Sequence, residues 1–263
     1  SADFKTAHYY WRGLQGEVSE RAYRLTASCL QYNPANYTLW QHRRQCWAVV
    51  STRPEVEWSL VRKVGGDNPK NYQIWHHLRC MVEQWEDEAM NSIVFINGVL
   101  KEDAKNYHAW SFRQWLAARM GSIWKRELDY TDKLIQDDVR NNSAWNHRWF
   151  VRQNFPSKDK EETEIAYAVR QGRLDPYNEC PWRYGLAWID KDPEKAPELD
   201  STLHSIHEND CSDSANLCGT RVDVLELINT SQSLQKAIQL TDMLQEMDMI
   251  SVKYWVFRKD GLQ

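Results

Sequence analysis

The sequence predicts an all-α protein: a crescent-shaped, right-handed α-α superhelix built from repeated antiparallel helical hairpins. The first observation behind this prediction is a template of Asn or Asp, two residues, Asn, three residues and Trp, which occurs five times. Its tryptophans are 35, 35, 35 and 37 residues apart, a period typical of stacked helical repeats. The five copies are Asn33–Trp40, Asn68–Trp75, Asp103–Trp110, Asp138–Trp145 and Asp175–Trp182.

The composition agrees with a helical array. Only 10 Gly and 8 Pro occur in 263 residues, too few for many turns or a flexible linker, while 14 Trp and 12 Tyr supply large apolar bodies for a core. No apolar run approaches the roughly 20 residues of a membrane span. The net charge of −4 gives no basis for binding nucleic acid or an anionic membrane. We therefore expect neither nucleic-acid binding nor membrane insertion.

The six cysteines indicate a reducing compartment. None are spaced as Cys-x-x-Cys, and their intervals lack the regularity of a disulfide framework. Free thiols are typical of intracellular proteins, so we expect a cytoplasmic protein without disulfides. The cysteines are Cys29, Cys46, Cys80, Cys180, Cys211 and Cys218.

Each copy of the template is interpreted as the start of the first helix of a hairpin. The leading Asn or Asp suits an N-cap, because its side-chain oxygen can accept from the first turn. In three copies Pro follows at the expected first helical position, and the Trp is expected about two turns into the helix. Ile93–Leu100 and Leu128–Ile135, with apolar residues at three- and four-residue steps, are examples of the second helix. We expect a single domain, 1–263, with repeats near 33–67, 68–102, 103–137, 138–174 and 175–210, and capping helices at 4–32 and 211–263.

The two ends of the chain are expected to cap the array, because terminal repeats depart from the consensus where one face meets water. Phe4–Leu30 predicts one additional hairpin, and Ser201–Phe257 predicts two or more weaker helices. The best candidates for loops are Asp190–Glu198 and Glu208–Asn216.

The repeated side chains have structural interpretations. The Trp of each copy is expected to pack in the core between hairpins. The second Asn of the template is expected to hydrogen-bond the backbone of the neighbouring repeat. Three residues after the Trp, three copies have an Arg that can pair with a nearby acid, whereas the second and fifth copies have Leu78 and Gly185 there. These arginines are Arg43, Arg113 and Arg148.

The residues that vary between copies are the candidates for a functional site. Lys70–Gln73 (KNYQ) and Lys105–His108 (KNYH) occupy equivalent places just before the Trp in adjacent repeats. Stacking would bring both clusters to one edge of the array, at adjacent helix N-termini. Lysine, amide, tyrosine and histidine donors gathered there could hold an anion, although a solvated rim explains the same residues equally well.

A zinc site is a weaker interpretation of this region. His76 and Cys80 are four residues apart and could share one face of a helix. Two ligands without a second pair are poor evidence for zinc, so a polar rim residue and a buried thiol are favoured.

The template and its flanking residues resemble the repeats of protein prenyltransferase α subunits, over essentially the whole chain from about Phe4 to Gln263. Three segments look specifically like the α subunit shared by farnesyltransferase and type I geranylgeranyltransferase. They are Asn68–His77 (NPKNYQIWHH), Glu102–Trp110 (EDAKNYHAW) and Asp138–Arg148 (DVRNNSAWNHR).

The resemblance implies an enzyme that is active only as a heterodimer. In this family the α subunit wraps around a β subunit, which holds the zinc and most of the isoprenoid pocket. The complex transfers a farnesyl or geranylgeranyl group from its diphosphate to the cysteine thiol of a C-terminal CaaX motif, as in small GTPases. The resemblance thus implies zinc bound by the partner, magnesium as a further cofactor, and no metal ligand in this chain.

The resemblance also assigns roles to residues at the mouth of the site. Lys70 matches the lysine that meets the isoprenoid diphosphate, and we expect it to act in catalysis together with Tyr107 and His108. A cation and hydroxyl donors fixed there would stabilise the charge that grows on the leaving diphosphate. The residues matched to the diphosphate are Lys70, Tyr72, Asn106, Tyr107 and His108.

The CaaX peptide is expected to contact a second group of residues. Gln73 matches the glutamine that meets the C-terminal carboxylate of the peptide, while Tyr37 and Ala35 match positions in the first repeat near that end. Leu78 departs from the family, which commonly has Arg there, and the departure concerns packing more than the site.

Two alternatives remain open on the residues alone. One is the Rab-specific geranylgeranyltransferase α subunit, whose repeats are similar but usually lack the Asn-Tyr-Gln and Asn-Tyr-His pairings. The other is a non-catalytic scaffold of TPR or HAT type, although the Leu-Gly and Ala signatures of the TPR repeat are missing here.

Overall fold

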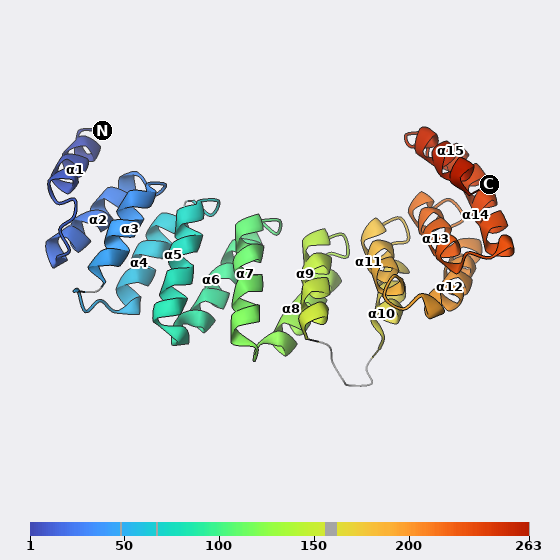
Figure 1. Cartoon of the computed structure of the whole chain (residues 1–263), viewed down its shortest axis with the longest axis horizontal. Coiled ribbons are helices and arrows are strands. Elements are labelled where there is room, and N and C mark those ends of the chain that lie inside the picture. Colours follow the sequence, from blue (N-terminus) through green and yellow to red (C-terminus); the bar gives the residue numbers. More distant parts are fainter. Residues whose placement is uncertain (48, 67, 156–161, 263) are drawn as a thin grey trace. The chain divides into compact units, whose positions relative to one another are not determined.

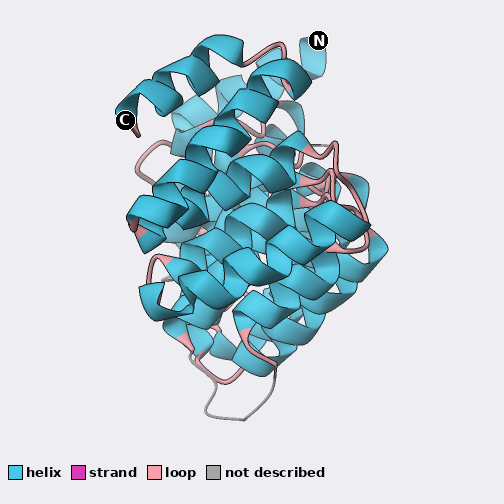
Figure 2. Ribbon diagram, turned by 90° about the vertical axis from the view of Figure 1, so that its right-hand side faces the viewer, coloured by secondary structure: helices cyan, strands magenta, loops and turns pink. Residues whose placement is uncertain are grey.

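The chain folds into helices joined by short turns. A computed structural model describes residues 1–47, 49–66, 68–155 and 162–262, and all regular elements within these ranges are helical (Figures 1 and 2). The all-α prediction is therefore confirmed. The chain divides into two compact units, Ser1–Ile123 and Trp124–Gln263, which we call the N-terminal and C-terminal units and describe separately.

The N-terminal unit contains seven α-helices in two layers. In one layer α3, α5 and α7 pack side by side, and in the other layer α2 packs against α4. Each of α3, α5 and α7 also packs as a hairpin against the helix that precedes it in the chain (Figure 1). The elements are α1 (Ala2–Gly13), α2 (Glu20–Tyr32), α3 (Tyr37–Cys46), α4 (Pro54–Gly65), α5 (Tyr72–Gln84), the 3-10 helix η1 (Glu86–Glu88), α6 (Ala89–Glu102) and α7 (Tyr107–Met120).

The C-terminal unit repeats this arrangement. Here α9, α11 and α13 pack in series, and each also contacts the helix that precedes it. Buried clusters of apolar side chains fill the space between these helices. The elements are α8 (Trp124–Asp137), α9 (Asn142–Asn154), α10 (Glu164–Gly172), α11 (Glu179–Ile189), the 3-10 helix η2 (Pro193–Lys195), α12 (Ala196–Asn209), α13 (Ala215–Ile228), α14 (Ser231–Met247) and α15 (Val252–Gly261).

The predicted helix starts are wrong by three residues. The N-cap is the second Asn of the template, as at Asn71, whose Oδ1 accepts from the backbone N–H of Gln73 at 2.9 Å. In two copies the leading residue instead ends the previous helix: Asn33 is the C-cap of α2 and Asp103 is the C-cap of α6. The Oδ1 atom of Asp103 accepts from the N–H of Lys105 at 3.2 Å. Pro34 and its equivalents therefore lie in a turn between helices, where a fixed φ and a missing N–H are equally harmless.

The template tryptophans lie in the core, as predicted, and each also closes the turn before its own helix. The indole N–H of Trp75 donates to the carbonyl oxygen of Pro69, six residues earlier, at 2.8 Å. Trp40, Trp110, Trp145 and Trp182 make the same bond, at 2.8–2.9 Å. Because the helix starts later than expected, the Trp lies one turn into it, not two.

The carbonyl that accepts from the Trp also joins successive hairpins. The oxygen of Pro69 accepts from Asn106 Nδ2 at 3.3 Å, and that of Val139 accepts from Asn178 Nδ2 at 2.8 Å. These two bonds confirm, for Asn106 and Asn178, that the template Asn hydrogen-bonds the neighbouring repeat. Both polar atoms of each Asn side chain are thus engaged. Oδ1 accepts from a backbone N–H of its own helix, and Nδ2 donates to the turn of the preceding repeat.

The same turn recurs beyond the fifth copy, in a segment that the sequence presented only as a cap. Ser214 caps α13 and donates its hydroxyl to the carbonyl of Pro176 at 2.8 Å, the position that Asn holds in other repeats. Cys218 takes the place of the Trp and is fully buried. Further on, Trp255 Nε1 donates to Asp248 Oδ2 at 3.0 Å, so a Trp again closes the turn before its helix.

One of the two predicted loops is wrong and the other is confirmed. Within Asp190–Glu198 only three residues are non-helical. Pro193 is the first residue of η2 and Pro197 is the second residue of α12, and Pro at the start of a helix favours helix formation. Residues Asp210–Ser214, between α12 and α13, form the centre of the second predicted loop. The hairpin predicted at Phe4–Leu30 is confirmed as α1 and α2.

A buried carboxylate organises the polar core of the N-terminal unit. Glu57 on α4 accepts two hydrogen bonds from Arg43 on α3, at 2.8 and 2.9 Å, and one from His77 on α5, at 2.9 Å. Tyr23 and Trp47 also donate to it. Burial alone would raise the pKa of Glu57, but the bond from His77 and the charge of Arg43 outweigh it and lower the pKa to about 2. The network thus links α2, α3, α4 and α5.

The predicted pairing of the repeat arginines with acids holds for Arg43 and for Arg148. In the C-terminal unit, Arg148 donates to both oxygens of Glu164, at 2.7 and 2.9 Å, and to Asp132. Its guanidinium lies 3.6 Å from the centre of the Tyr167 ring. Arg113 donates to Asn97 Oδ1 at 2.6 Å.

None of the six cysteines, all of which lie in the described ranges, forms a disulfide. Within the described ranges, no helix combines the length and the apolar character needed to cross a bilayer.

Two helical glycines provide a test of the packing. A Cβ on Gly172 would lie 2.3 Å from the ring of Trp182, whereas a Cβ on Gly98 would meet nothing within 4 Å. We expect Gly172→Ala to lower the free energy of unfolding by about 1–3 kcal/mol through overpacking. Gly98→Ala, the matched control in α6, should raise it by about 0.5–1 kcal/mol. Urea unfolding of both variants measures this, and equal effects would contradict the packing around Trp182.

His77 predicts a loss of stability in mild acid. Burial lowers the pKa of His77 from 6.5 to about 4, so the unfolded chain binds a proton at a higher pH than the folded chain does. The stabilisation from neutral His77 is complete above pH 6.5 and is lost as the pH falls towards 4. The stabilisation from the Glu57 carboxylate is lost only at lower pH, as the pH falls from 4.5 towards 2. We expect Tm to fall between pH 7 and pH 5, and the fall to be smaller in His77→Gln. The exposed His204→Gln is the control, and an unchanged pH slope in His77→Gln would contradict the assignment.

Candidate functional site

The candidate site lies on the N-terminal unit, at the edge where α3, α5 and α7 begin. Each of these helices starts with a tyrosine directly after the capping Asn. The Asn side chain holds the turn, and the tyrosine that follows points away from the core. Tyr37, Tyr72 and Tyr107 are accordingly 68%, 70% and 73% exposed. Three hydroxyl groups are thereby presented at three adjacent helix N-termini, whose free N–H groups favour an anion.

Lys70 lies in the turn immediately before α5. Its side chain is 79% exposed, and Nζ lies 3.6 Å from Asp103 Oδ2 in the next turn. An exposed pair at this distance is weak, because solvent screens it and ordering the long side chain costs entropy. A stronger anion could therefore take the ammonium group from Asp103. In the preceding repeat, Ala35 holds the equivalent place and is exposed.

Tyr72, Tyr107 and His108 line one cleft between α5 and α7. Its volume is about 260 Å³. The rings of Tyr72 and His108 meet edge to face, with centroids 4.3 Å apart, and Tyr107 lies 5.6 Å from His108. Because burial lowers the pKa of His108, its imidazole is neutral at neutral pH. It can then donate one hydrogen bond, through whichever ring nitrogen carries the proton.

Further residues line the same cleft that the sequence did not assign to it. His76 and Arg79 lie four and seven residues after Tyr72, on the same face of α5, and Ser111 lies four residues after Tyr107 on α7. This spacing was visible in the sequence and could have identified them. Trp75 and Phe112 complete the lining of the cleft.

The remaining predicted residues are not among those that line this cleft. Gln73, half-buried, begins α5 beside Tyr72, and Tyr37 and Ala35 lie one repeat earlier at the start of α3. Asn106 is buried, and its amide is used by the N–H of Ala109 and by the carbonyl of Pro69. The structure therefore gives Asn106 a positioning task, and its predicted contact with the diphosphate stays a prediction, as do the other assigned roles.

His76 and Cys80, the two zinc ligands considered from the sequence, lie close to each other. Cys80 Sγ lies 3.9 Å from His76 Nε2. Across the described ranges, no three His, Cys, Asp or Glu side chains gather closely enough to hold a metal ion. Two ligands fall short of the three or four protein ligands that zinc takes.

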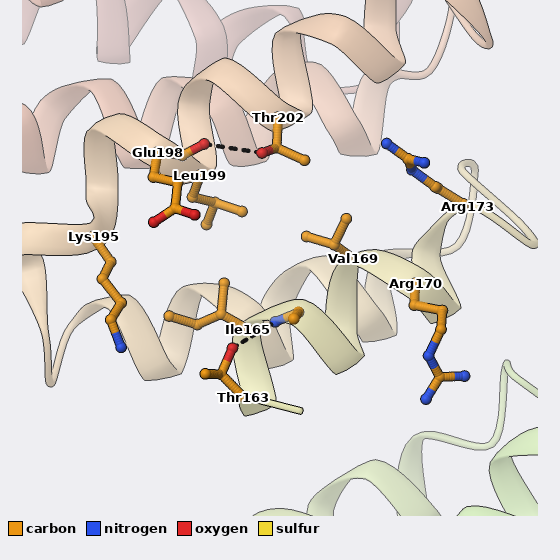
Figure 3. A pocket seen from close by; sticks show the side chains of 10 residues that line it. Thr163, Ile165, Val169, Arg170, Arg173, Lys195, Glu198, Leu199 and Thr202 are labelled. Atoms are coloured by element: carbon orange, nitrogen blue, oxygen red, sulfur yellow. Dashed lines mark hydrogen bonds between the residues drawn. The ribbon is translucent and has the colours of Figure 1, made fainter. Parts of the chain in front are cut away.

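A second hollow, in the C-terminal unit, contains none of the predicted site residues. It lies between α10 and α12 and has a volume of about 430 Å³. Ile165, Val169 and Leu199 form its apolar surface, with Arg170 and Arg173 towards one end (Figure 3). None of the residues that line this hollow belongs to the clusters Lys70–Gln73 and Lys105–His108, so the hollow and the predicted site are separate features.

Comparison with known proteins first defines the class. The chain matches the family described as "Protein prenyltransferase alpha subunit repeat" at residues 19–48, 54–85, 90–120 and 124–155. It also resembles the solved structure of Candida albicans protein geranylgeranyltransferase-I complexed with GGPP. The TM-score is 0.83 at 23% sequence identity, over 100% of this chain and 91% of that chain. This likeness confirms the α-α superhelix as the fold.

A curated relative identifies the family more closely. The "Protein farnesyltransferase/geranylgeranyltransferase type-1 subunit alpha" of Solanum lycopersicum is 39% identical over 283 residues, which cover 98% of this chain and 82% of the relative. The chain therefore belongs to the family of α subunits shared by protein farnesyltransferase and protein geranylgeranyltransferase type I. The resemblance found in the repeat motifs is confirmed, and neither a TPR scaffold nor a Rab-type α subunit is needed to explain the sequence.

Proposed function

We propose that this chain is the non-zinc subunit of a heterodimeric protein prenyltransferase and contributes the mouth of its diphosphate site. The observation that carries the proposal is the cleft in which Tyr72, Tyr107 and His108 meet. Lys70 does not line this cleft but lies in the turn two residues before Tyr72. These are hydrogen-bond donors around a helix end, with one exposed cation. Such a group suits a polyanion that arrives with another molecule.

The proposed reaction explains these residue types. A cysteine thiolate of the CaaX protein attacks C1 of farnesyl or geranylgeranyl diphosphate, a C–S bond forms, and the C1–O bond breaks. Negative charge then grows on the departing diphosphate. Lys70 would exchange Asp103 for this charge, and the hydroxyls of Tyr72 and Tyr107 would donate to it. Donors that act on charge present only in the transition state raise the rate more than they raise affinity.

The metals of the reaction are assigned outside this chain. Zinc, when bound, supplies a thiolate at neutral pH, and we propose that the β subunit holds it, because His76 and Cys80 alone offer too few ligands. Magnesium is proposed to accompany the diphosphate. The residues of this chain would bind the leaving group, orient it and exclude water from it.

The partner and the zinc assignment are tested together. Mixed with a β subunit of farnesyltransferase or of geranylgeranyltransferase type I, the chain should form a heterodimer that prenylates a CaaX peptide. The interface should exceed the roughly 2,000 Å² of permanent complexes, so the chain alone should be poorly stable. Metal analysis should find zinc in the heterodimer and none in the separated chain. A stable monomer that binds neither β subunit, or one that retains zinc at His76 and Cys80, would overturn the proposal. Activity only with Rab and its escort would favour the Rab-type alternative.

Lys70 is expected to act on the chemical step. Lys70→Ala should slow single-turnover prenyl transfer by about 10²-fold, on the scale of a lost charge-stabilising donor. Binding of the isoprenoid diphosphate should weaken far less, because the charge that Lys70 meets is concentrated in the transition state. Tyr107→Phe and His108→Ala should act in the same direction with smaller effects. Lys63→Ala, an exposed cation on α4, is the control; a normal single-turnover rate in Lys70→Ala would remove Lys70 from the site.

Gln73 is expected to act on the peptide. Its amide would donate to the C-terminal carboxylate of the CaaX motif, an interaction made equally in the ground and transition states. Gln73→Ala should therefore raise KM for the peptide several-fold and change kcat little. Gln84→Ala, exposed at the other end of α5, is the control. Steady-state kinetics with peptide and with protein substrate give the answer, and an unchanged KM with both would exclude the contact.

A further inference from the structure

Arg44 is a half-buried cation that the described part of the chain leaves without a partner. It lies on α3, and no hydrogen bond or ion pair reaches its guanidinium in the described residues; Nη1 is fully shielded from solvent. Burial lowers the pKa of Arg44, and the group that counteracts this is the thiol of Cys80 on α5, not a carboxylate. Arg44 thus faces α5 without the acid that a shielded arginine needs.

Two buried arginines of this protein show what is missing around Arg44. Arg43, one residue earlier, is paired with both oxygens of Glu57, and Arg148 is paired with both oxygens of Glu164. Shielding a guanidinium from water without such a partner opposes folding, because the lost hydration is not replaced. A chain that satisfies two arginines so fully and leaves a third unsatisfied indicates that the partner of Arg44 comes from elsewhere.

The surroundings of Arg44 add positive charge. Arg79 holds the equivalent position in the next repeat, 35 residues on, and its guanidinium lies 5.4 Å from the centre of the Trp115 ring. Burial lowers the pKa of His76 on α5, and the charges of Arg44 and Arg79 lower it further. Glu83 opposes them at His76 but forms no ion pair with either arginine in the described structure. The face of α3 and α5 at this level therefore complements an acidic group.

We propose that a carboxylate of the partner subunit enters between α3 and α5 and pairs with Arg44 when the heterodimer forms. This inference rests on the proposed function, because it requires a second subunit on this face. It assigns Arg44 to assembly, in contrast to Lys70, whose proposed task is the chemical step. Arg79 and His76 would strengthen the attraction without being the main partners of the carboxylate.

The test compares stability and assembly in one set of variants. Arg44→Met keeps the length and apolar stem of the side chain but removes the charge. It should leave the separated chain as stable as the wild type or more stable, and weaken heterodimer formation at least about tenfold. Arg44→Lys should recover part of the affinity. Arg43→Met should instead destabilise the separated chain, because Glu57 loses its partner, and Arg62→Met, on α4 beside Trp58, should change neither property.

Thermal unfolding of the separated chain and titration against the purified β subunit measure the two properties. If Arg44→Met pairs with the β subunit as tightly as the wild type, the inference is wrong while the proposed function stands. If Arg44→Met pairs normally but binds isoprenoid diphosphate weakly, the anion is the substrate and not a carboxylate of the partner. If the wild-type chain pairs with neither β subunit, the proposed function fails first, and all variants then behave alike in the titration.

Discussion

The bond between each template Trp and a carbonyl six residues earlier underlies the repeat. It joins the start of a helix to the turn before it, and the same carbonyl oxygen can accept a second bond from the next repeat. Pro69, Val139 and Pro176 each receive both bonds, the second from Asn106, Asn178 and Ser214 respectively. One backbone oxygen thus holds a turn together and fixes the spacing to the following hairpin, which explains why Asn and Trp recur while the residues between them vary.

This constraint also produces the candidate site. Because the turn and the cap are satisfied by Asn and Trp, the residues on either side of the Asn carry no structural duty and can differ between copies. In the N-terminal unit these free positions hold tyrosines, Lys70, Gln73 and His108. Successive helix starts lie next to one another, so residues 36 apart in the sequence, Tyr72 and His108, bring their rings within 4.3 Å. The repeat is a rigid frame on which a few side chains define the chemistry.

Buried charge is handled in two different ways within the N-terminal unit. Arg43 is neutralised inside the chain by Glu57, and the network extends through His77 to the next hairpin. Arg44, its half-buried neighbour in sequence, forms no ion pair with a carboxylate in the described part of the chain. The first arrangement stabilises the unit by itself, whereas the second is suited to a unit that is completed by another chain. The heterodimer expected for this family would reconcile the two.

The sequence by itself determined the helical repeat, its period, the buried tryptophans, the pairing of Arg43 and Arg148 with acids, and the family. These follow from local spacing, because a 35-residue period and a fixed Trp leave few other folds. It also placed Lys70, Tyr72, Tyr107 and His108 at one edge, since equivalent positions of stacked repeats must lie together. Their catalytic roles were implied by resemblance and remain predictions.

Only the tertiary structure decided where each helix begins. Both the leading Asn or Asp and the second Asn of the template can cap a helix, and the choice depends on the hydrogen bond from the Trp indole to the carbonyl in the preceding turn. It also revealed the repeat turn at Ser214, where Ser214 and Cys218 replace Asn and Trp. A further turn, before α15, has Ser251 in place of the capping Asn but keeps a Trp at Trp255. The unmatched charge of Arg44 depends on which helix faces which. That information resides in packing between elements distant in sequence, which no local pattern encodes.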